Sequence, residues 1–286
     1  MKEKETTEHW DVVVDADKNR ISINIRELWR YRDLIMQFAK RDIATVYYQT
    51  ILGPLWFLIQ PLLTSLLFIV VFSNIAGIKT DGIPGILFYL SGLTVWGYFL
   101  TSFNATSNTF VTNAAIFGKV YFPRMVTPIS KIISSLFIFG VQFLLFLGFL
   151  IYFMLFKGLH MSVNIYMLLI PYLVLVMGGI GLGAGIIISS LTTKYRDITF
   201  LVTFGVQLLL YLTPVIYPMT EIVGKKRMII LANPISSVVE GFRYAFFPVG
   251  QFPFKHLAYS SIVMVIMLFA GMLMFNKIEK NFMDTV

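Results

Sequence analysis

Long apolar runs are the feature that most restricts what this sequence can fold into. Each run is close to the roughly 20 residues that an α-helix needs to cross a bilayer. Strands of a membrane barrel would be about ten residues long with alternating polarity, whereas these runs are apolar on every side. We therefore expect an all-α polytopic membrane protein with six transmembrane helices, at residues 51–72, 83–103, 129–156, 165–191, 198–217 and 257–275.

The composition is also that of a chain that faces lipid. Of the 286 residues, 57% are hydrophobic and 13% are charged, too few charges to cover the surface of a soluble domain of this length. The absence of cysteine from the sequence excludes a disulfide framework. The net charge is +8, but the charged residues concentrate in the first fifty residues and in short loops, which is typical of membrane topology rather than of nucleic-acid binding.

Lysine and arginine predict the orientation of the chain. Residues 1–50 hold nine of them, and the loops on the same side of the six spans hold more than the opposite short loops, which contain only Lys79 and Lys157. Basic residues accumulate on the cytoplasmic side, so both termini are expected in the cytoplasm. Residues 218–255 carry five basic residues on the outer side, but long translocated segments follow this rule poorly.

These patterns divide the chain into a polar N-terminal tail (1–24), an amphipathic helix (25–50), the six-span domain (51–276) and a cytoplasmic tail (277–286). In the amphipathic helix, apolar residues recur at helical spacing with basic residues between them. This pattern suits a helix at the inner membrane surface. Two roles explain the pattern equally well: a helix that only anchors the chain on lipid, and a helix that takes part in the function of the protein.

Residues 218–255 match neither a span nor an ordinary loop. Prolines interrupt the segment, and Glu240 and Arg243 lie within its apolar part. Non-helical backbone at membrane depth needs protein or water around it. We therefore expect two short helices here that dip back into the outer leaflet.

Patterns of catalysis are missing from the sequence. His9, His160 and His256 are scattered, no cluster of His, Asp or Glu has the spacing of metal ligands, and no phosphate-binding loop occurs. The chain is therefore expected to be no enzyme, to hold no metal or cofactor, and to depend on another protein for energy. The glycine-rich stretch 178–185 lacks the context of a nucleotide loop and predicts close packing between helices.

Aromatic rings gather in the first two predicted spans. Rings can stack on the C–H faces of sugars, so a smooth aromatic channel could pass a polysaccharide; packing and lipid contact are the simpler explanation for any single ring. The candidate channel residues are Trp56, Phe57, Tyr89, Trp96 and Phe99.

With these elements in place, the chain resembles the permease subunits of ABC-2 type transporters, above all those that export O-antigen, capsule or teichoic acid polysaccharides. The stretches that carry the resemblance are RELWRYRDL (26–34), YQTILGPLW (48–56), FGKVYFPR (117–124), KYRD (194–197), NP (233–234) and EGFR (240–243). None of these is specific alone, but their order around six spans is typical of the family.

The resemblance implies a homodimer in the bacterial inner membrane, with a channel for a lipid-linked polysaccharide at its interface. Two separate ATPase subunits would bind ATP and Mg²⁺ and contact the cytoplasmic loops. The implied coupling residues are Asn113, Phe117, Lys119, Arg124, Lys194, Tyr195, Arg196 and Asp197. The implied interface or gate helix residues are Trp29, Arg30, Arg32 and Arg41, and the implied outer gate residues are Asn233, Pro234, Glu240 and Arg243.

The charged turn 194–197 fits this interpretation. Topology alone accounts for Lys194 and Arg196 but not for Asp197, because acidic residues contribute little to orientation. Alternatives remain open on the sequence: an ABC-2 exporter of a drug or lipid, a secondary transporter or channel, and a membrane-embedded glycosyl- or acyltransferase. The last two lack the membrane-embedded acids or the catalytic groups that they would need.

Overall fold

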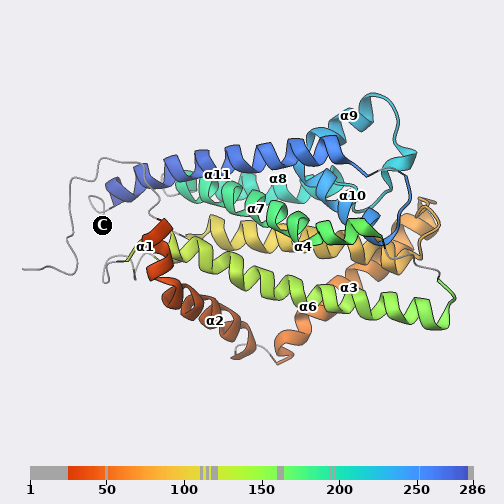
Figure 1. Cartoon of the computed structure of the whole chain (residues 1–286), viewed down its shortest axis with the longest axis horizontal. Coiled ribbons are helices and arrows are strands. Elements are labelled where there is room, and N and C mark those ends of the chain that lie inside the picture. Colours follow the sequence, from red (N-terminus) through yellow and green to blue (C-terminus); the bar gives the residue numbers. More distant parts are fainter. Residues whose placement is uncertain are drawn as a thin grey trace, which may run out of the picture.

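A computed structural model describes residues 25–48, 51–109, 112–113, 116, 122–159, 164–192, 195, 197–250 and 252–282. Within these residues all regular secondary structure is helical, which confirms an all-α polytopic architecture. Figure 1 shows an elongated bundle, with α1 and the C-terminal end of α11 at one end and α9 and α10 at the other. We refer to these as the inner and outer ends, following the orientation expected from the sequence.

Short helical turns and long helices alternate along the chain. In sequence order they are α1 Ile25–Arg30, α2 Arg32–Tyr48, η1 Gly53–Leu55, α3 Trp56–Phe68, η2 Ile69–Ile75, α4 Gly85–Ser107, α6 Val126–Phe156, η3 Ile165–Leu169, α7 Ile170–Thr192, α8 Ile198–Tyr211, η4 Met219–Glu221, α9 Lys225–Ala232, α10 Pro234–Phe246 and α11 Phe254–Phe282.

Five helical stretches are long and apolar enough to cross a membrane: Gly53–Ile75, Gly85–Ser107, Val126–Phe156, Ile165–Thr192 and Phe254–Lys277. The remaining predicted span, 198–217, contains only the 14 residues of α8. A helix of that length is about 21 Å long, shorter than the roughly 30 Å hydrocarbon core of a bilayer. Pro214 explains the early end, since proline disfavours helical backbone at the residue before it and cannot donate a helical hydrogen bond. The count of six spans stays a prediction.

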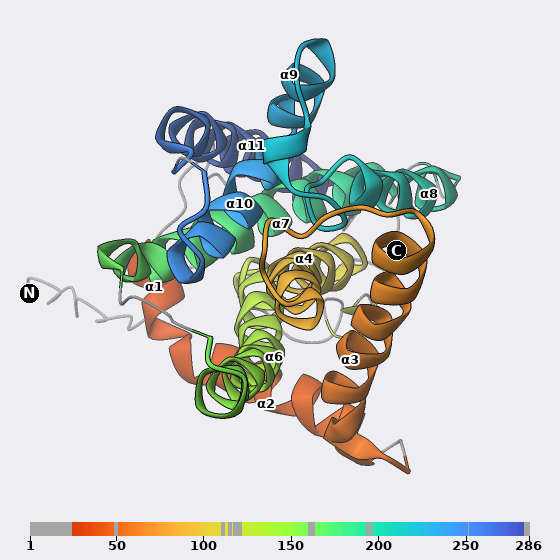
Figure 2. The same ribbon diagram turned by 90° about the vertical axis from the view of Figure 1, so that its right-hand side faces the viewer.

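Helix α4 forms the centre of the bundle. In its most apolar stretch 83% of the residues are buried, against 17% in the corresponding stretches of α3 with η2, of α6 and of α11. Figure 2, which looks along the bundle, shows α3 and α8 at the margin, with α4 more central. The apolar residues that α3 and α8 expose therefore face lipid or another chain, and they include Leu63, Leu67, Phe200, Leu201 and Phe204.

The glycines of α7 allow this helix to lie close to two neighbours. A Cβ atom at Gly185 would lie 2.6 Å from the Cβ of Thr106 and 3.0 Å from the carbonyl oxygen of Phe103, both on α4. On the opposite face, a Cβ atom at Gly183 would lie 2.8 Å from the backbone nitrogen of Leu268 on α11. Small residues permit such close approach of helices in membranes. The packing role predicted for the stretch 178–185 is confirmed.

Candidate functional site

Helix α2 lies against the inner end of the bundle. Ile35 and Ala39 are buried, and the rings of Phe38 and Phe122 meet edge to face with centroids 5.7 Å apart. The opposite side of the N-terminal segment is open, since Trp29 is 69% exposed and the guanidinium of Arg32 lies 5.7 Å from its ring centre. Arg30 and Arg41 are exposed as well. One amphipathic helix was expected at 25–50; residues 25–48 instead form α1 and α2, and α2 has one face packed on α6, while residues 49–50 lie outside the described residues.

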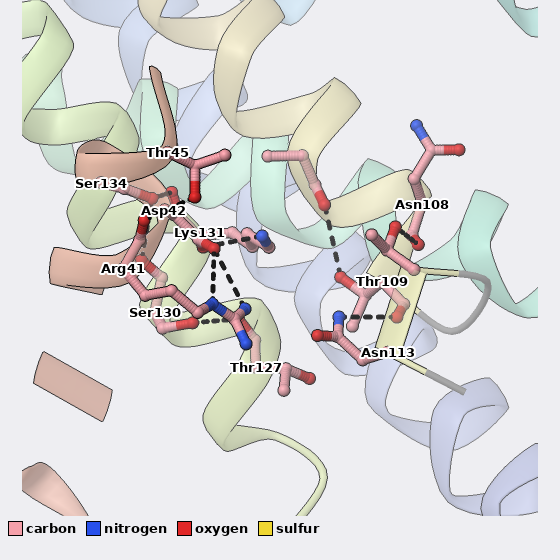
Figure 3. A network of polar contacts seen from close by, with 12 residues as sticks. Arg41, Asp42, Thr45, Asn108, Thr109, Asn113, Thr127, Ser130, Lys131 and Ser134 are labelled. Carbon is pink, nitrogen blue, oxygen red and sulfur yellow. Dashed lines mark hydrogen bonds and ion pairs between the residues drawn. The ribbon is translucent and has the colours of Figure 1, made fainter. Parts of the chain in front are cut away.

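A polar contact strengthens this packing. The Nζ atom of Lys131, on α6, lies 2.7 Å from Oδ2 of Asp42, on α2. The Nη2 atom of Arg41 donates to Oδ1 of the same carboxylate at 3.1 Å, and Figure 3 shows both basic side chains directed at Asp42. We call these three residues the inner clamp. The side chains of Lys131 and Asp42 are only 15% and 16% exposed, so the pair is largely shielded from water.

No role in a site was expected for Asp42 or Lys131 from the sequence. One signal was present. Asp42 follows Ile35 and Ala39 at helical spacing, so the acidic group lies on the apolar face of α2. A charge on a buried helix face needs a partner, and this requirement could have directed attention to a basic residue on the helix beneath.

The first implied coupling segment, 113–124, is described only in part. Asn113 is buried and its Nδ2 donates to the carbonyl oxygen of Thr109 at 2.9 Å, a contact drawn in Figure 3. Arg124 is 7% exposed, and its carbonyl oxygen accepts a hydrogen bond from Oγ1 of Thr127 at 2.8 Å. Burial leaves the side chains of Asn113 and Arg124 little surface for contact with a partner, and the carbonyl of Arg124 bonds to the first turn of α6. Phe117 and Lys119 lie outside the described residues.

The second implied coupling segment is the turn between α7 and α8. Tyr195 is 54% exposed and Asp197 is exposed at the residue before α8. A carboxylate at this place is favoured by the partial positive charge of a helix N-terminus. Lys194 and Arg196 lie outside the described residues, so a pairing of Arg196 with Asp197 stays a prediction.

The five candidate channel rings do not share one surface in the chain. Tyr89, Trp96 and Phe99 are all on the buried helix α4, with 0%, 5% and 3% exposure. The hydroxyl of Tyr89 lies 3.0 Å from Oγ of Ser73 in η2, and its ring meets that of Phe68 with centroids 5.7 Å apart. These three rings fill the core between helices.

Helix α3 carries the other two candidate rings. Trp56 is 45% exposed and Phe57 is partly buried. Only Trp56 thus presents a largely open ring on the margin of this chain.

The segment between α8 and α11 contains the two short helices expected there, α9 and α10. Asn233 precedes α10: its Oδ1 accepts from the backbone N–H of Ile235 at 3.0 Å, and its Nδ2 donates to Oγ1 of Thr213 at 2.9 Å. Pro234 occupies the first position of the helix, where its missing N–H is not needed. The carbonyl oxygen of Pro234 accepts from Oγ of Ser260, on α11, at 2.6 Å. The predicted Asn–Pro pair thus fixes the start of α10 against two neighbours.

Arg243 holds α10 against α4. Its side chain is 5% exposed, and the guanidinium carbon lies 3.8 Å from the centre of the Phe88 ring. Nη1 lies 3.5 Å from Oε2 of Glu240, and Nη2 lies 3.5 Å from the carbonyl oxygen of Val215. The guanidinium fills a space beside Gly92, where a Cβ atom would lie 3.1 Å from Nη2. Glu240 and Arg243, predicted as outer gate residues, form one buried cluster.

Helix α10 also packs on the outer part of α6 through phenylalanine rings. Phe146 meets Phe246 with ring centroids 4.9 Å apart and Phe242 at 6.0 Å, and Phe143 lies 5.9 Å from Phe242. We call these four residues the outer aromatic cluster. Helix α6 therefore touches α2 near its first turns and α10 further along, so one continuous helix joins the inner clamp to the outer end.

Comparisons of the sequence with known proteins identify its family. A sequence model described as ABC-2 type transporter matches residues 33–247. A protein named O-antigen export system permease protein RfbA, from Klebsiella pneumoniae, is 28% identical over 252 residues, covering 88% of this chain and 94% of that protein. A protein of the same name from Myxococcus xanthus is 25% identical over 266 residues, covering 92% and 98%.

Proposed function

The chain belongs to the ABC-2 type transporter family, and we propose that it is the permease subunit of an exporter for a lipid-linked polysaccharide such as O-antigen. The observation that carries the proposal is the extent of the similarity. Proteins named for O-antigen export match the chain over 88% to 92% of its length and over 94% to 98% of their own. The family model, which matches residues 33–247, runs from the start of α2 to the end of α10.

We propose that two copies of the chain form the transport channel in the bacterial inner membrane, with both termini in the cytoplasm. The exposed apolar residues of α3 and α8 support a second copy at that margin, since Phe200 and Leu201 are 79% and 71% exposed and Leu63 is 57% exposed. Separate ATPase subunits would bind ATP and Mg²⁺ and supply the energy. They would contact the segment before α6 and the turn around Tyr195 and Asp197.

The geometry supports a mechanical route from these contacts to the outer side. A displacement of the segment before α6 acts directly on the inner end of that helix, where Lys131 is bound to Asp42. Helix α6 runs without a break over 31 residues and carries Phe143 and Phe146 against α10. Movement of α6 would then displace α10, which lies at the outer end and would gate the exit of the polymer.

Complementation of a strain that makes O-antigen but lacks its own export permease tests the proposal. The chain is produced with its ATPase partner, and O-antigen on the cell surface is measured by antibody binding to intact cells. We expect surface polymer only when both proteins are present, and we expect the ATPase to co-purify with the chain.

Two results would contradict this function. Transport by the chain without any ATPase would favour a secondary transporter or channel. Export of a small drug or lipid, with the polymer retained inside the cell in the presence of both proteins, would favour the other type of ABC-2 exporter.

A further inference from the structure

A pocket of about 650 Å³ opens at the outer end of the bundle, beside the helices that form the proposed outer gate. Its walls come from α9, from α10 and from the first residues of α11, which Figure 1 shows at the same end of the molecule. The lining residues on which the argument depends are Arg227, Glu240, Phe252, Phe254, Lys255 and His256. Its volume is in the range of pockets that hold small molecules or cofactors, about 300–1,000 Å³.

Two cationic side chains meet at this pocket from different elements. Arg227 comes from α9 and Lys255 from α11, and both are exposed. Across the part of the chain that the structure describes, neither has an ion-pair partner within 4.0 Å. Arg227 also faces the carboxylate of Glu240 at longer range. Both cations can still bind an anionic ligand, and phosphate oxygens are well suited to such charge-assisted hydrogen bonds.

The same pocket contains a carboxylate. Glu240 is bonded to Arg243 through Oε2 alone, at 3.5 Å, and 18% of its side chain remains exposed. A second carboxylate lies at the rim, where Asp81 accepts from Oγ1 of Thr220, another lining residue, at 2.7 Å. A ligand with negative charge only would meet repulsion here, whereas a ligand with one anionic and one cationic group matches both sets of side chains.

An apolar wall completes the pocket. The rings of Phe252 and Phe254 lie with centroids 4.5 Å apart, and Phe252 is stacked on Tyr166 at 4.7 Å. Phe252 is buried, but Phe254 is 57% exposed at the first residue of α11, next to Lys255. An aromatic ring beside a lysine at the end of a transmembrane helix is typical of the membrane interface, where acyl chains and headgroups meet.

From these features we propose that the pocket binds a zwitterionic phospholipid headgroup. The phosphate lies between Arg227 and Lys255, the primary ammonium lies at Glu240, and the acyl chains run along Phe254. The chemistry of the site goes beyond the proposed export function, and only the assignment to the outer leaflet rests on the proposed orientation. A lipid held between α9, α10 and α11 would stabilise the closed position of α10.

Native mass spectrometry of the purified full chain in detergent tests the site. The chain is incubated with phosphatidylethanolamine, with phosphatidylglycerol of the same acyl chains, and with farnesyl phosphate, and the retained lipid is counted. We expect phosphatidylethanolamine to be retained about tenfold more than phosphatidylglycerol, the ratio that one additional charge-assisted hydrogen bond supports. Farnesyl phosphate carries the phosphate without the ammonium and should be retained no better than phosphatidylglycerol.

Three variants separate the two parts of the headgroup. Arg227→Gln with Lys255→Gln should lower retention of both phospholipids about tenfold or more, because both lose the phosphate contacts. Glu240→Gln should lower retention of phosphatidylethanolamine to the level of phosphatidylglycerol and leave the latter unchanged or higher. Lys225→Gln with Lys226→Gln removes the same charge from α9 outside the pocket lining and should change neither.

Several outcomes would overturn the proposal. An equal loss in the Lys225 and Lys226 variant would mean that general surface charge retains the lipid. Loss of both lipids in Glu240→Gln would mean that this carboxylate holds α10 rather than the ligand. Preferential retention of farnesyl phosphate would instead place the pocket on the route of a lipid-linked substrate. None of these results alters the complementation test of export, which can fail independently.

Discussion

Two of the regions where α6 meets other helices, the inner clamp and the outer aromatic cluster, are built from opposite chemistry. At the inner clamp, Lys131 and Asp42 form a polar contact across 2.7 Å. At the outer aromatic cluster, Phe143 and Phe146 pack on α10 without polar groups. The 31 residues of α6 give it a length of about 46 Å. One continuous helix thus connects a directional contact at the inner end to a non-directional contact at the outer end.

The difference suggests how each region responds when α6 is displaced. An ion pair has one good geometry and is weakened when water enters, so it opens or closes as a unit. Aromatic rings retain much of their contact through small displacements, because several arrangements of two rings have similar energies. The inner clamp is therefore suited to hold α2 and α6 together, while the outer aromatic cluster is suited to move α10 without releasing it.

Removal of Arg243 should have the largest effect on the outer region. Arg243→Ala leaves Glu240 with its charge uncompensated inside the protein and removes the guanidinium from Phe88. Breaking a buried pair in this way costs about 3–5 kcal/mol. Thermal unfolding of the purified chain in detergent should show the loss.

Two variants control for this prediction. Lys225→Ala removes an exposed basic residue from the neighbouring helix and should leave unfolding nearly unchanged. Arg243→Leu combined with Glu240→Leu removes both charges and should recover much of the stability. If Arg243→Ala unfolds like the wild type, the buried cluster does not hold α10 to α4.

Gly185→Ala should have the next largest effect, on the contact of α7 with the central helix α4, against which α6 also packs. The new methyl group would meet Thr106 and the backbone of Phe103, and overpacking of this kind costs about 1–3 kcal/mol. Gly205→Ala, on α8, has nothing within 4 Å of the added Cβ and serves as the matched control. Equal unfolding temperatures for the two variants would argue against close packing of α7 on α4.

The inner clamp should contribute least to stability. A double-mutant cycle with Asp42→Ala and Lys131→Ala should give a coupling energy of about 1 kcal/mol, because the pair is shielded but not fully buried. Export by the Asp42→Ala and Lys131→Ala variants should fall much further than this small change in stability implies. If the two substitutions change the free energy of unfolding additively, and if both single variants export normally, the inner clamp has no part in the mechanism.

How much of this could be predicted from the sequence differs between the two regions. Glu240 and Arg243 were visible as charges in an apolar segment, and Pro234 after Asn233 was visible as an interruption of it. The structure places all four residues in or directly before α10. Such signals are local, because a charge or a proline is unusual wherever the surrounding residues are apolar.

The inner clamp had no comparable signal, since its two partners are 89 positions apart and only the fold brings Asp42 to Lys131. Aromatic residues were equally hard to interpret. Tyr89 and Trp96 are buried in the core and Trp56 is exposed, yet all three lie in runs that are apolar on every side. Hydropathy cannot separate contact with lipid, with a channel and with other helices.

The central claim is that movement at the inner end of α6 opens α10 at the outer end, and a single thiol tests it directly. The sequence contains no cysteine, so Ser237→Cys introduces one reporter. Ser237 is 2% exposed and its Oγ lies 2.6 Å from Oγ of Ser260 on α11, so the thiol becomes reactive only when α10 separates from α11.

The measurement is the rate at which a membrane-impermeant maleimide labels this thiol from the outer side, in the complex with the ATPase, with and without MgATP. We predict that MgATP raises the rate severalfold and that Asp42→Asn with Lys131→Met abolishes the increase while ATP hydrolysis continues. An equal increase in the clamp variant would contradict the account, because α10 would then open without the connection through α2 and α6.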